Sequence, residues 1–354
     1  MTPEKLKPGA TFREIYSQAD SCKRTLELAD ARSQLFDRLL PIDQYTDIIL
    51  TGCGSSYNLA RCASFAWSRI LHRPVRAIAS SELMGFPDVY LTDGAQPLVV
   101  AISRTGGTTE VQLAVQRLTR EYDARALAVT GQAHSPVGAV CLAELAFAEC
   151  HEESIVMTQA FTCMLTGLYL IADTVAGSRH KTEISQIPCL IAESIHKSEE
   201  LLRRSAEDER VNHFFFLGSG VMKGLADECA LKMTEMALSQ ASSHRSLEFR
   251  HGPKAALDQN SSVILFPVAA ERPYVETLLE EIQTTGAQIL LVSDSIDGLS
   301  ADFCSIVSGS GLSEFLRPAL YAHIGQLLAC WRATSRGLDP HSPRYLARTV
   351  LLDV

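Results

Sequence analysis

The 354-residue sequence lacks the features of several protein classes. Its ten cysteines include no Cys-x-x-Cys pair, so neither a zinc knuckle nor a dithiol redox motif is encoded, and most are expected to be small buried hydrophobes. No stretch approaches the ~20 uninterrupted apolar residues of a membrane span. The first twenty residues, MTPEKLKPGATFREIYSQAD, lack the apolar core of a signal peptide. We therefore expect a cytoplasmic protein without a membrane segment.

Positive charge is also scarce. Lysine and arginine total 32 against 41 acidic residues, and the formal net charge is −9 at pH 7. This balance argues against a general nucleic-acid surface but leaves room for a local basic pocket that binds a small anion. With 46% hydrophobic and 21% charged residues, the chain has the composition of an ordinary globular protein. Its length exceeds what one core usually organises, which favours two domains.

What the sequence does contain is an internal repeat. The segment DIILTGCGSSYNLA at 47–60 and the segment HFFFLGSGVMKGLA at 213–226 both predict a buried strand, a Gly-x-Gly turn and the start of a helix. The glycines recur about 166 residues later, and two further predicted strands of the first half, 97–103 and 126–130, have counterparts in the second half at a similar offset. Such self-similarity indicates two copies of one architecture.

Strands that alternate with helices of ten or more residues predict an α/β fold, because parallel strands need long crossover connections. We expect two tandem doubly wound parallel-sheet domains, with the boundary in the polar stretch 176–188. The predicted organisation is an N-terminal helical segment at 1–30, a first domain at 31–185, a second domain at 186–340 and a C-terminal active-site tail at 341–354.

A hydroxyl-rich glycine loop, AISRTGGTTE at 101–110, follows one of the predicted strands. Ligands of such sheets bind beyond the carboxyl ends of the strands, where glycine lets the backbone come close. The hydroxyls of Ser103, Thr105 and Thr108 and the guanidinium of Arg104 suit a phosphate. A locally capped helix start is an equally good interpretation of the same residues.

The turn Gly-Cys-Gly-Ser-Ser at 52–56 is half of a dinucleotide fingerprint, but it lacks the third glycine. A nicotinamide cofactor is therefore not expected. The hydroxyls of Ser55 and Ser56 are expected to point into the mouth between the first and fourth strands. Cys53, a lone cysteine with no histidine near it in sequence, is interpreted as packing rather than as a nucleophile.

An acid, a lysine and a second acid occupy one predicted helix, in DECALKMTEMALSQASSHRSLEFRHGP at 227–253. Glu228, Lys232 and Glu235 are spaced i, i+4 and i+7 and so share one face. The spacing alone favours a solvated surface stripe. His251, just before Gly-Pro, is either a structural turn residue or a functional group.

These segments resemble the sugar isomerase (SIS) family, in particular the isomerase part of glucosamine-6-phosphate synthase and its free-standing relatives. The resemblance rests on Glu-x-x-x-Lys-x-x-Glu at 228–235, on His-Gly-Pro at 251–253, and on GCGSSYNLA, SRTGGTTE and the C-terminal PRYLARTV. It extends over nearly the whole chain. The sequence departs from the synthases at Arg348, where they have lysine, at Arg104, where they usually have glutamine, and around Gln159, where a serine and a lysine are missing. The last two changes are more like the branch of tagatose-6-phosphate isomerases and amino-sugar-phosphate deaminases.

The resemblance implies an aldose–ketose isomerase of a sugar 6-phosphate, acting through an enediol or, with deamination of an amino sugar, an enediolamine. It implies that Glu235 is the base, that His251 opens the ring from the neighbouring subunit of a homodimer with a shared active site, and that Lys232, held by Glu228, stabilises the intermediate. The phosphate would contact Ser103, Thr105 and Thr108, with Ser55, Ser56 and Arg104 nearby. Ala347 and Arg348 complete the implied site, and an arginine at 348 cannot readily shed a proton as a lysine can.

Two other functions remain open. The chain could isomerise a sugar with another anion, such as a 6-sulfo-hexose, because Arg104 would serve either group. It could also be a non-catalytic sugar-phosphate sensor, although binding alone does not need both Glu235 and His251. No cofactor, metal or nucleic-acid partner is expected in any of these cases.

Overall fold

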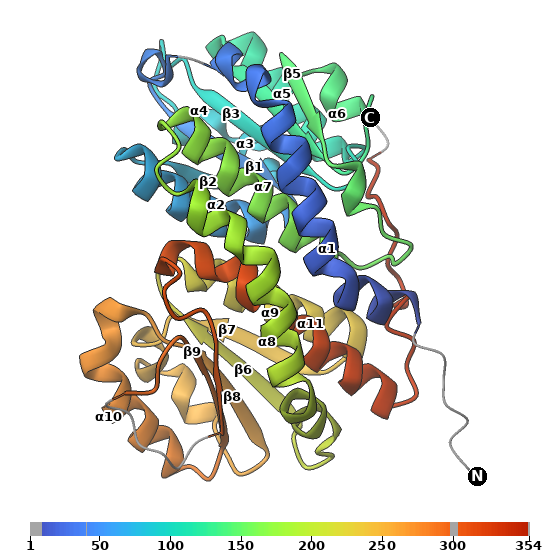
Figure 1. Ribbon diagram of the computed structural model, residues 1–354, viewed down its shortest axis with the longest axis vertical. Coiled ribbons are helices and arrows are strands. Elements are labelled where there is room, and N and C mark those ends of the chain that lie inside the picture. The colour runs from blue at the N-terminus through green and yellow to red at the C-terminus, as the bar shows by residue number, and fades with distance from the viewer. Residues whose placement is uncertain (1–8, 40, 298–303, 353–354) are drawn as a thin grey trace. The chain divides into compact units, whose positions relative to one another are not determined.

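The computed structural model describes residues 9–39, 41–297 and 304–352 and contains two compact units (Figure 1). The first-sheet unit comprises Gln18–Glu152, Gln159–Pro188 and Ala347–Val354. The second-sheet unit comprises Met1–Ser17, Glu153–Thr158 and Cys189–Leu346. Each unit is built around one five-stranded sheet.

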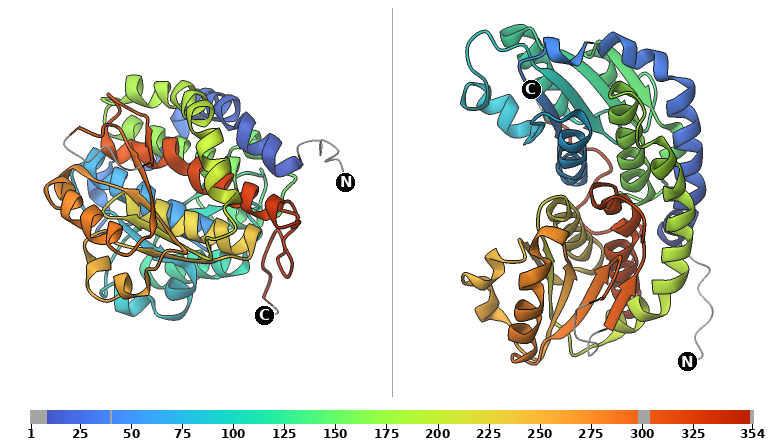
Figure 2. Two further views of the ribbon diagram at one scale, coloured as in Figure 1. Left: turned by 90° about the horizontal axis from the view of Figure 1, so that it is seen from below. Right: turned by 60° about the vertical axis from the view of Figure 1, so that its left-hand side comes forward.

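The first sheet has the strand order β2-β1-β3-β4-β5, and all its pairs are parallel. Helices cover both of its faces (Figure 2). The strands are β1 (Ile48–Gly52), β2 (Arg76–Ala79), β3 (Leu98–Ser103), β4 (Arg125–Thr130) and β5 (Ala143–Ala146). The helices of this half of the chain are α1 (Ala10–Ala31), α2 (Ser55–Leu71), α3 (Ser80–Gly85), α4 (Pro87–Tyr90), α5 (Thr109–Tyr122), α6 (Pro136–Ala139) and α7 (Gln159–Val175).

The second sheet repeats this arrangement with the order β10-β9-β8-β6-β7, again all parallel. Its strands are β6 (His213–Gly218), β7 (Gln240–His244), β8 (Ser261–Phe266), β9 (Gln288–Ser293) and β10 (Cys304–Val307). The helices are α8 (Lys181–Glu207), α9 (Met222–Ala237), α10 (Arg272–Gln283) and α11 (Arg317–Ser335). With β6 aligned to β1, the two sheets have the same strand order, so the predicted tandem doubly wound fold is confirmed.

The repeated glycines have the same structural role in both units. Gly54 and Gly220 both have φ of 54°, a left-handed conformation that favours glycine. A Cβ at Gly52 would lie 2.8 Å from the carbonyl carbon of Ser56, and one at Gly218 would lie 2.7 Å from the carbonyl oxygen of Met222. The Gly-x-Gly turn therefore lets each first helix start close behind its strand.

One local expectation is corrected. The crevice beside β1 lies next to β2 and β3, not next to the fourth strand, because β3 separates β1 from β4. The polar stretch 176–188, where the domain boundary was expected, contains the start of α8, which begins at Lys181 and includes Pro188. The division between the units falls within this helix, at Pro188.

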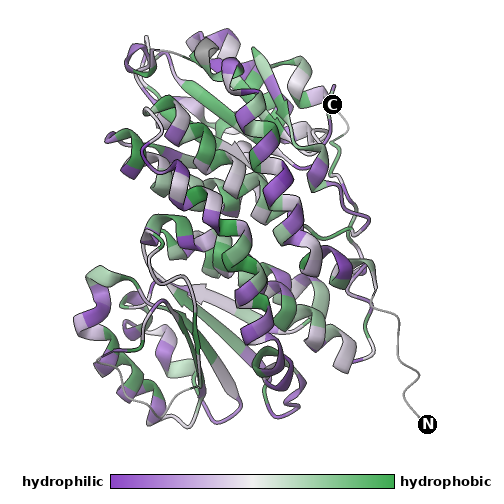
Figure 3. Ribbon diagram, viewed as in Figure 1, coloured by the Kyte–Doolittle hydropathy of each residue, from purple (hydrophilic) through white to green (hydrophobic). Residues whose placement is uncertain are grey.

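The central strands β3 and β8 are largely apolar because helices cover both faces of a parallel sheet, whereas the edge strand β7 is polar and only partly buried. Every residue of β3 and of β8 is buried, and Figure 3 shows most strands as hydrophobic segments. Six of the ten cysteines are buried, as expected for small core residues. Among the described residues, no helix has the length and apolar character that crossing a membrane requires.

Candidate functional site

The hydroxyl-rich loop connects the carboxyl end of β3 to α5 in the first-sheet unit. Ser103 and Thr108 lie 3.2 Å apart at their hydroxyl oxygens, and the amide of Gly106 donates to the Ser103 hydroxyl at 3.1 Å. Gly106 has φ of 65°, and a Cβ there would lie 2.1 Å from Cβ of Ser135, so glycine is required for this tight turn. The loop thus gathers hydroxyls and a helix amino terminus, a combination suited to an anion.

The residues after β1 lie beside this loop. β1 and β3 are neighbours with Thr51 paired to Ala101, so the segments that follow both strands leave the same edge of the sheet. Ser55 and Ser56 form the first turn of α2; Ser56 is buried and Ser55 is partly exposed. The structure therefore places Ser55 and the loop at the point where the strand order reverses, which is the usual ligand position in such sheets.

Arg104 is not a free cation in this loop. Its Nη1 lies 3.0 Å from Oε2 of Glu152, whose side chain is only 1% exposed. Glu152 also accepts the amide of Ala160 at the start of α7, at 3.1 Å. Removing one partner of such a buried ion pair strongly destabilises a protein, because the other charge stays buried without compensation. Arg104 therefore has a structural partner as well as a position beside the hydroxyls.

Residues of the C-terminal tail contact Arg104, Glu152 and Thr105. The Arg348 guanidinium donates to the carbonyl of Glu152, and the Arg348 carbonyl accepts a long 3.4 Å bond from Arg104. The Thr349 hydroxyl donates to the Thr105 hydroxyl at 3.0 Å, whereas Ala347 is exposed. A hollow of about 60 Å³ is lined in part by Arg104, Thr105, Glu152 and Arg348. This volume is too small for a hexose phosphate, so the two arginines border a recess rather than a complete binding site.

The acid–lysine–acid group lies on α9 in the second-sheet unit. The Lys232 Nζ lies 3.3 Å from Glu228 Oε1 and 2.5 Å from Glu235 Oε2. Side-chain exposure is 1% for Lys232, 2% for Glu228 and 20% for Glu235. The interpretation of these residues as a solvated stripe is therefore wrong. The predicted core stripe Leu225, Cys229, Met233 and Met236 is buried as expected.

Close packing against α11 explains the burial of this group. Gly325 of α11 approaches α9 so closely that a Cβ would lie 2.5 Å from the Cys229 sulfur. Burial alone would lower the pKa of Lys232, but the carboxylates of Glu228 and Glu235 outweigh it and the net direction is upward. Lys232 is therefore an ammonium ion that orients Glu235, the one member of the group with an accessible carboxylate.

His251 is set apart from this group. It caps the short 3-10 helix Glu248–Arg250, and the residue is exposed. Among the described residues, no hydrogen bond or ion pair joins its imidazole to Glu228, Lys232 or Glu235. The structure thus brings three of the four predicted catalytic residues into contact and leaves His251 at the surface.

Cys53 behaves as the packing interpretation requires. Burial, with a smaller contribution from the Glu110 carboxylate, raises the pKa of the Cys53 thiol to about 11. A thiol of this kind is protonated at neutral pH and is a poor nucleophile. Among the described residues, no group of three or more His, Cys, Asp or Glu side chains is arranged so that it could hold a metal ion.

Glu152 was missed by the sequence interpretation. It lies 48 residues from Arg104, a separation at which no helical or strand periodicity relates two positions. The one available signal was its place shortly before the apolar helix α7, where a carboxylate is favoured by the helix dipole. That signal predicts a carboxylate that caps the helix, and it does not predict the ion pair between Glu152 and Arg104.

Comparison with known proteins agrees with this architecture. The family model described as "SIS domain" matches residues 42–172 and 209–307. Curated relatives include the glutamine–fructose-6-phosphate aminotransferases [isomerizing] of Brucella abortus, 26% identical over 86% of this chain and 52% of the relative, and of Thermococcus kodakarensis, 29% identical over 98% and 58%. The chain spans just over half the length of these relatives.

Solved structures give matches along almost the whole chain. The glucosamine-6-phosphate deaminase of Thermotoga maritima is 28% identical with a TM-score of 0.79, over 97% of this chain and 100% of that one. The tagatose-6-phosphate ketose/aldose isomerase of Escherichia coli is 21% identical with a TM-score of 0.86, over 97% and 96%, and supports the fold. Because the family model covers more than half of the sequence in two copies, one in each sheet unit, the chain belongs to the SIS domain family.

Proposed function

We propose that this protein is an aldose–ketose isomerase of a sugar 6-phosphate. The observation that carries the proposal is the arrangement on α9, where a buried ammonium contacts a carboxylate that remains 20% exposed. Moving a proton between C1 and C2 of an open-chain sugar needs one accessible carboxylate base. A chain that only bound sugar phosphates would have no need for a buried ion group that fixes such a base.

In this reaction Glu235 removes the proton from C2 of the aldose, the C1–C2 double bond forms, and O1 takes up a proton from water as the C1 carbonyl opens, which gives the enediol. The O2 hydroxyl then returns a proton to water as the C2 carbonyl forms, and C1 receives the proton held by the Glu235 carboxylic acid, which yields the ketose. Lys232 is only 1% exposed, so we assign it a positioning role through Glu235 rather than contact with the sugar. Glu228 balances the charge of Lys232 within the helix packing.

The anion is assigned to the loop after β3. Ser103, Thr105 and Thr108 supply hydroxyls, and Ser55 lies at the neighbouring strand end. Arg104 and Arg348 add two positive charges near the loop, and the Glu152 carboxylate lies 3.0 Å from Arg104. A phosphate or a sulfonate would both suit this charge balance.

Deamination of an amino-sugar phosphate is the second candidate. It is favoured by the Thermotoga maritima protein named glucosamine-6-phosphate deaminase, which matches 97% of this chain at 28% identity. The same base would act, and the C2 amine would leave as ammonia after hydrolysis of the intermediate. Isomerisation and deamination differ in the product formed, not in the residues assigned here.

We further propose a cytoplasmic homodimer in which His251 assists ring opening in the partner's active site. The exposure of His251 and its separation from the Glu235 group in the described chain support this assignment. An exposed imidazole that makes no contact with the α9 group of its own chain, among the residues described, is available to a second copy.

The test is an incubation of the purified protein with a panel of hexose 6-phosphates, hexosamine 6-phosphates and 6-sulfo-hexoses. NMR would detect ketose formation, and a separate enzymatic assay would measure ammonia. Ketose without ammonia supports the isomerase, and ketose with equimolar ammonia supports the deaminase. Binding of a sugar phosphate without turnover of any member of the panel would favour a sensor and contradict the proposal.

A further inference from the structure

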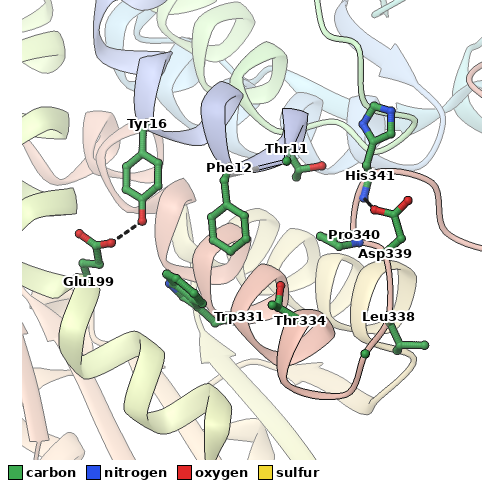
Figure 4. Close-up of a pocket in the computed structure, with 12 residues that line it drawn as sticks. Thr11, Phe12, Tyr16, Glu199, Trp331, Thr334, Leu338, Asp339, Pro340 and His341 are labelled. Carbon is green, nitrogen blue, oxygen red and sulfur yellow. Dashed lines mark hydrogen bonds between the residues drawn. The ribbon is translucent and has the colours of Figure 1, made fainter. Parts of the chain in front are cut away.

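One pocket is lined by none of the residues assigned to catalysis or to the anion. It has a volume of about 700 Å³, which is within the range of small-molecule sites. Figure 4 shows that its walls come from the start of α1, from α8, from the end of α11 and from the segment after α11. All of its lining residues belong to the second-sheet unit, and none is a predicted catalytic or phosphate-binding residue.

Aromatic rings form one wall of this pocket. The rings of Phe12 and Trp331 have centroids 4.6 Å apart at an angle of 57°, and Phe12 stacks on Tyr16 at 6.3 Å. Leu338 and Pro340 add apolar surface from the segment after α11. Such a wall favours a ligand with a flat or apolar body, and its ring faces attract a cation.

The charged groups in the pocket are all acidic. Glu199 and Asp339 contribute carboxylates on opposite sides of the view in Figure 4, and none of the lining residues is lysine or arginine. Tyr16 donates its hydroxyl to Glu199 at 2.5 Å, and the Asp339 carboxylate accepts the amide of His341 at 2.9 Å. Both carboxylates are therefore held in fixed positions. An anionic sugar phosphate would be repelled here, which distinguishes this pocket from the loop after β3.

The wall opposite the aromatic rings is also fixed in place. The His341 carbonyl accepts the amide of Ile155 at 3.1 Å, and the His341 ring lies 3.4 Å from the Ser154 hydroxyl. A pocket whose walls are held by hydrogen bonds on both sides is preformed, which reduces the entropy lost when a ligand binds.

We propose that this pocket binds a small organic ammonium ion whose apolar body lies against Phe12 and Trp331 and whose charge is balanced by Glu199 and Asp339. The ligand class follows from the aromatic wall and the two carboxylates, with no lysine or arginine among the described residues that line the pocket. This site is independent of the proposed isomerase activity.

The chain offers a built-in reporter for this site. It has two tryptophans, and Trp67 is fully buried with its indole nitrogen donating to the Leu168 carbonyl. In a Trp67→Phe variant, the fluorescence comes from Trp331 alone.

The probe is phenethylammonium, and its matched controls are the neutral 2-phenylethanol and the anionic 3-phenylpropanoate. Calorimetry of the unsubstituted protein repeats each titration without the fluorophore change.

We expect saturable binding of phenethylammonium at least about 10-fold tighter than binding of 2-phenylethanol, and no binding of the anion. Glu199→Gln combined with Asp339→Asn should weaken cation binding by about 10-fold or more. Glu200→Gln is the matched control because Glu200 lies on the same helix and bonds Arg203 and Arg204 instead; it should leave the affinity unchanged.

Three results would overturn the proposal. The first is equal affinity for the cation and the neutral alcohol, and the second is the absence of saturable binding in both fluorescence and calorimetry. The third concerns residues 1–8, which precede the pocket residue Gly9. If the cation binds only after these residues are deleted, the pocket is a seat for the chain's own first residues rather than a ligand site.

Discussion

Arg104 and Glu152 form an ion pair in which Nη1 lies 3.0 Å from Oε2, and their side chains are 13% and 1% exposed. The sequence suggested the Arg104 guanidinium as a group that suits the sugar anion. The pair gives Arg104 a structural role toward a carboxylate that has little access to water, in addition to the ligand role proposed for it. We therefore expect substitution of Arg104 to affect both binding and stability.

We expect Arg104→Gln to raise KM by roughly 10-fold, about 1.4 kcal/mol, with a smaller change in kcat, because an anion contact far from C1 and C2 contributes equally in the ground and transition states. The same variant should lose about 3 kcal/mol of stability, since Glu152 keeps a buried charge without its partner. Steady-state kinetics and urea unfolding measure the two effects.

The double variant Arg104→Gln, Glu152→Gln separates these roles. Replacing both charges should recover most of the stability while KM stays high. If KM returns to the value of the unsubstituted protein, Arg104 is a structural residue and the anion is bound by the hydroxyls alone.

The fold was predictable because its signals are local. A strand, a Gly-x-Gly turn and a helix are adjacent in sequence, and their recurrence identifies the duplication. The strand order was not predictable in the same way. Buried parallel strands are apolar on both faces, so their sequences do not indicate which strands they pair with. The crevice beside β1 was therefore first placed next to the wrong strand.

The sequence predicted that the three α9 residues share one face of the helix, but it did not predict that they are buried. Helical periodicity puts Glu228, Lys232 and Glu235 on one face, yet the same pattern suits a solvated surface. Their burial depends on α11, where Gly325 allows close contact with Cys229 almost one hundred residues away in sequence. No periodicity within α9 can report the approach of a distant helix.

Glu235→Gln should reduce kcat by about 10² to 10⁴, because the amide keeps the shape of the side chain but cannot accept a proton. Binding of the substrate, measured by calorimetry, should change little. Asp227→Asn on the same helix is the control, since Asp227 bonds Lys223 and Ser243 and has no assigned role in the reaction. Activity above a tenth of that of the unsubstituted protein would remove Glu235 from the mechanism.

Lys232→Met should destabilise the protein by about 3–5 kcal/mol, because Glu228 would be left as a buried carboxylate without its counter-charge. Adding Glu228→Gln should restore a large part of this loss in thermal or urea unfolding. A double variant as unstable as the single one would mean that the packing volume of Lys232, rather than its charge, stabilises α9.

Mixed dimers test the role proposed for His251. Glu235→Gln and His251→Ala chains should each be inactive, and co-refolding should return part of the activity if each dimer contains one site with both native residues. Two tags on the chains allow the mixed dimer to be isolated. Verified mixed dimers without activity would show that His251 does not serve the partner's site.

We expect His323 to give the stability of the protein a pH dependence that does not involve the residues assigned to catalysis. It is fully buried on α11, its Nδ1 donates to the Leu320 carbonyl at 2.8 Å, and its Nε2 lies 3.1 Å from the Ser198 hydroxyl. Burial lowers the pKa of His323 from 6.5 to about 4. The folded protein therefore holds a neutral imidazole under conditions in which the unfolded chain is already protonated.

Because the folded pKa is depressed, the stability contributed by neutral His323 is complete above pH 6.5 and is lost progressively as the pH falls toward 4. This predicts that the free energy of unfolding falls by about 2 kcal/mol between pH 7.5 and pH 5 through this residue alone. Urea unfolding at the two pH values measures the change.

His323→Gln, which keeps hydrogen-bonding capacity without titrating, should be less stable at pH 7.5 but should lose about 2 kcal/mol less on acidification. His134→Gln is the control, because His134 is exposed and its replacement should leave the pH dependence intact. An equal pH dependence in the His323→Gln variant and the unsubstituted protein would mean that other groups determine the acid sensitivity.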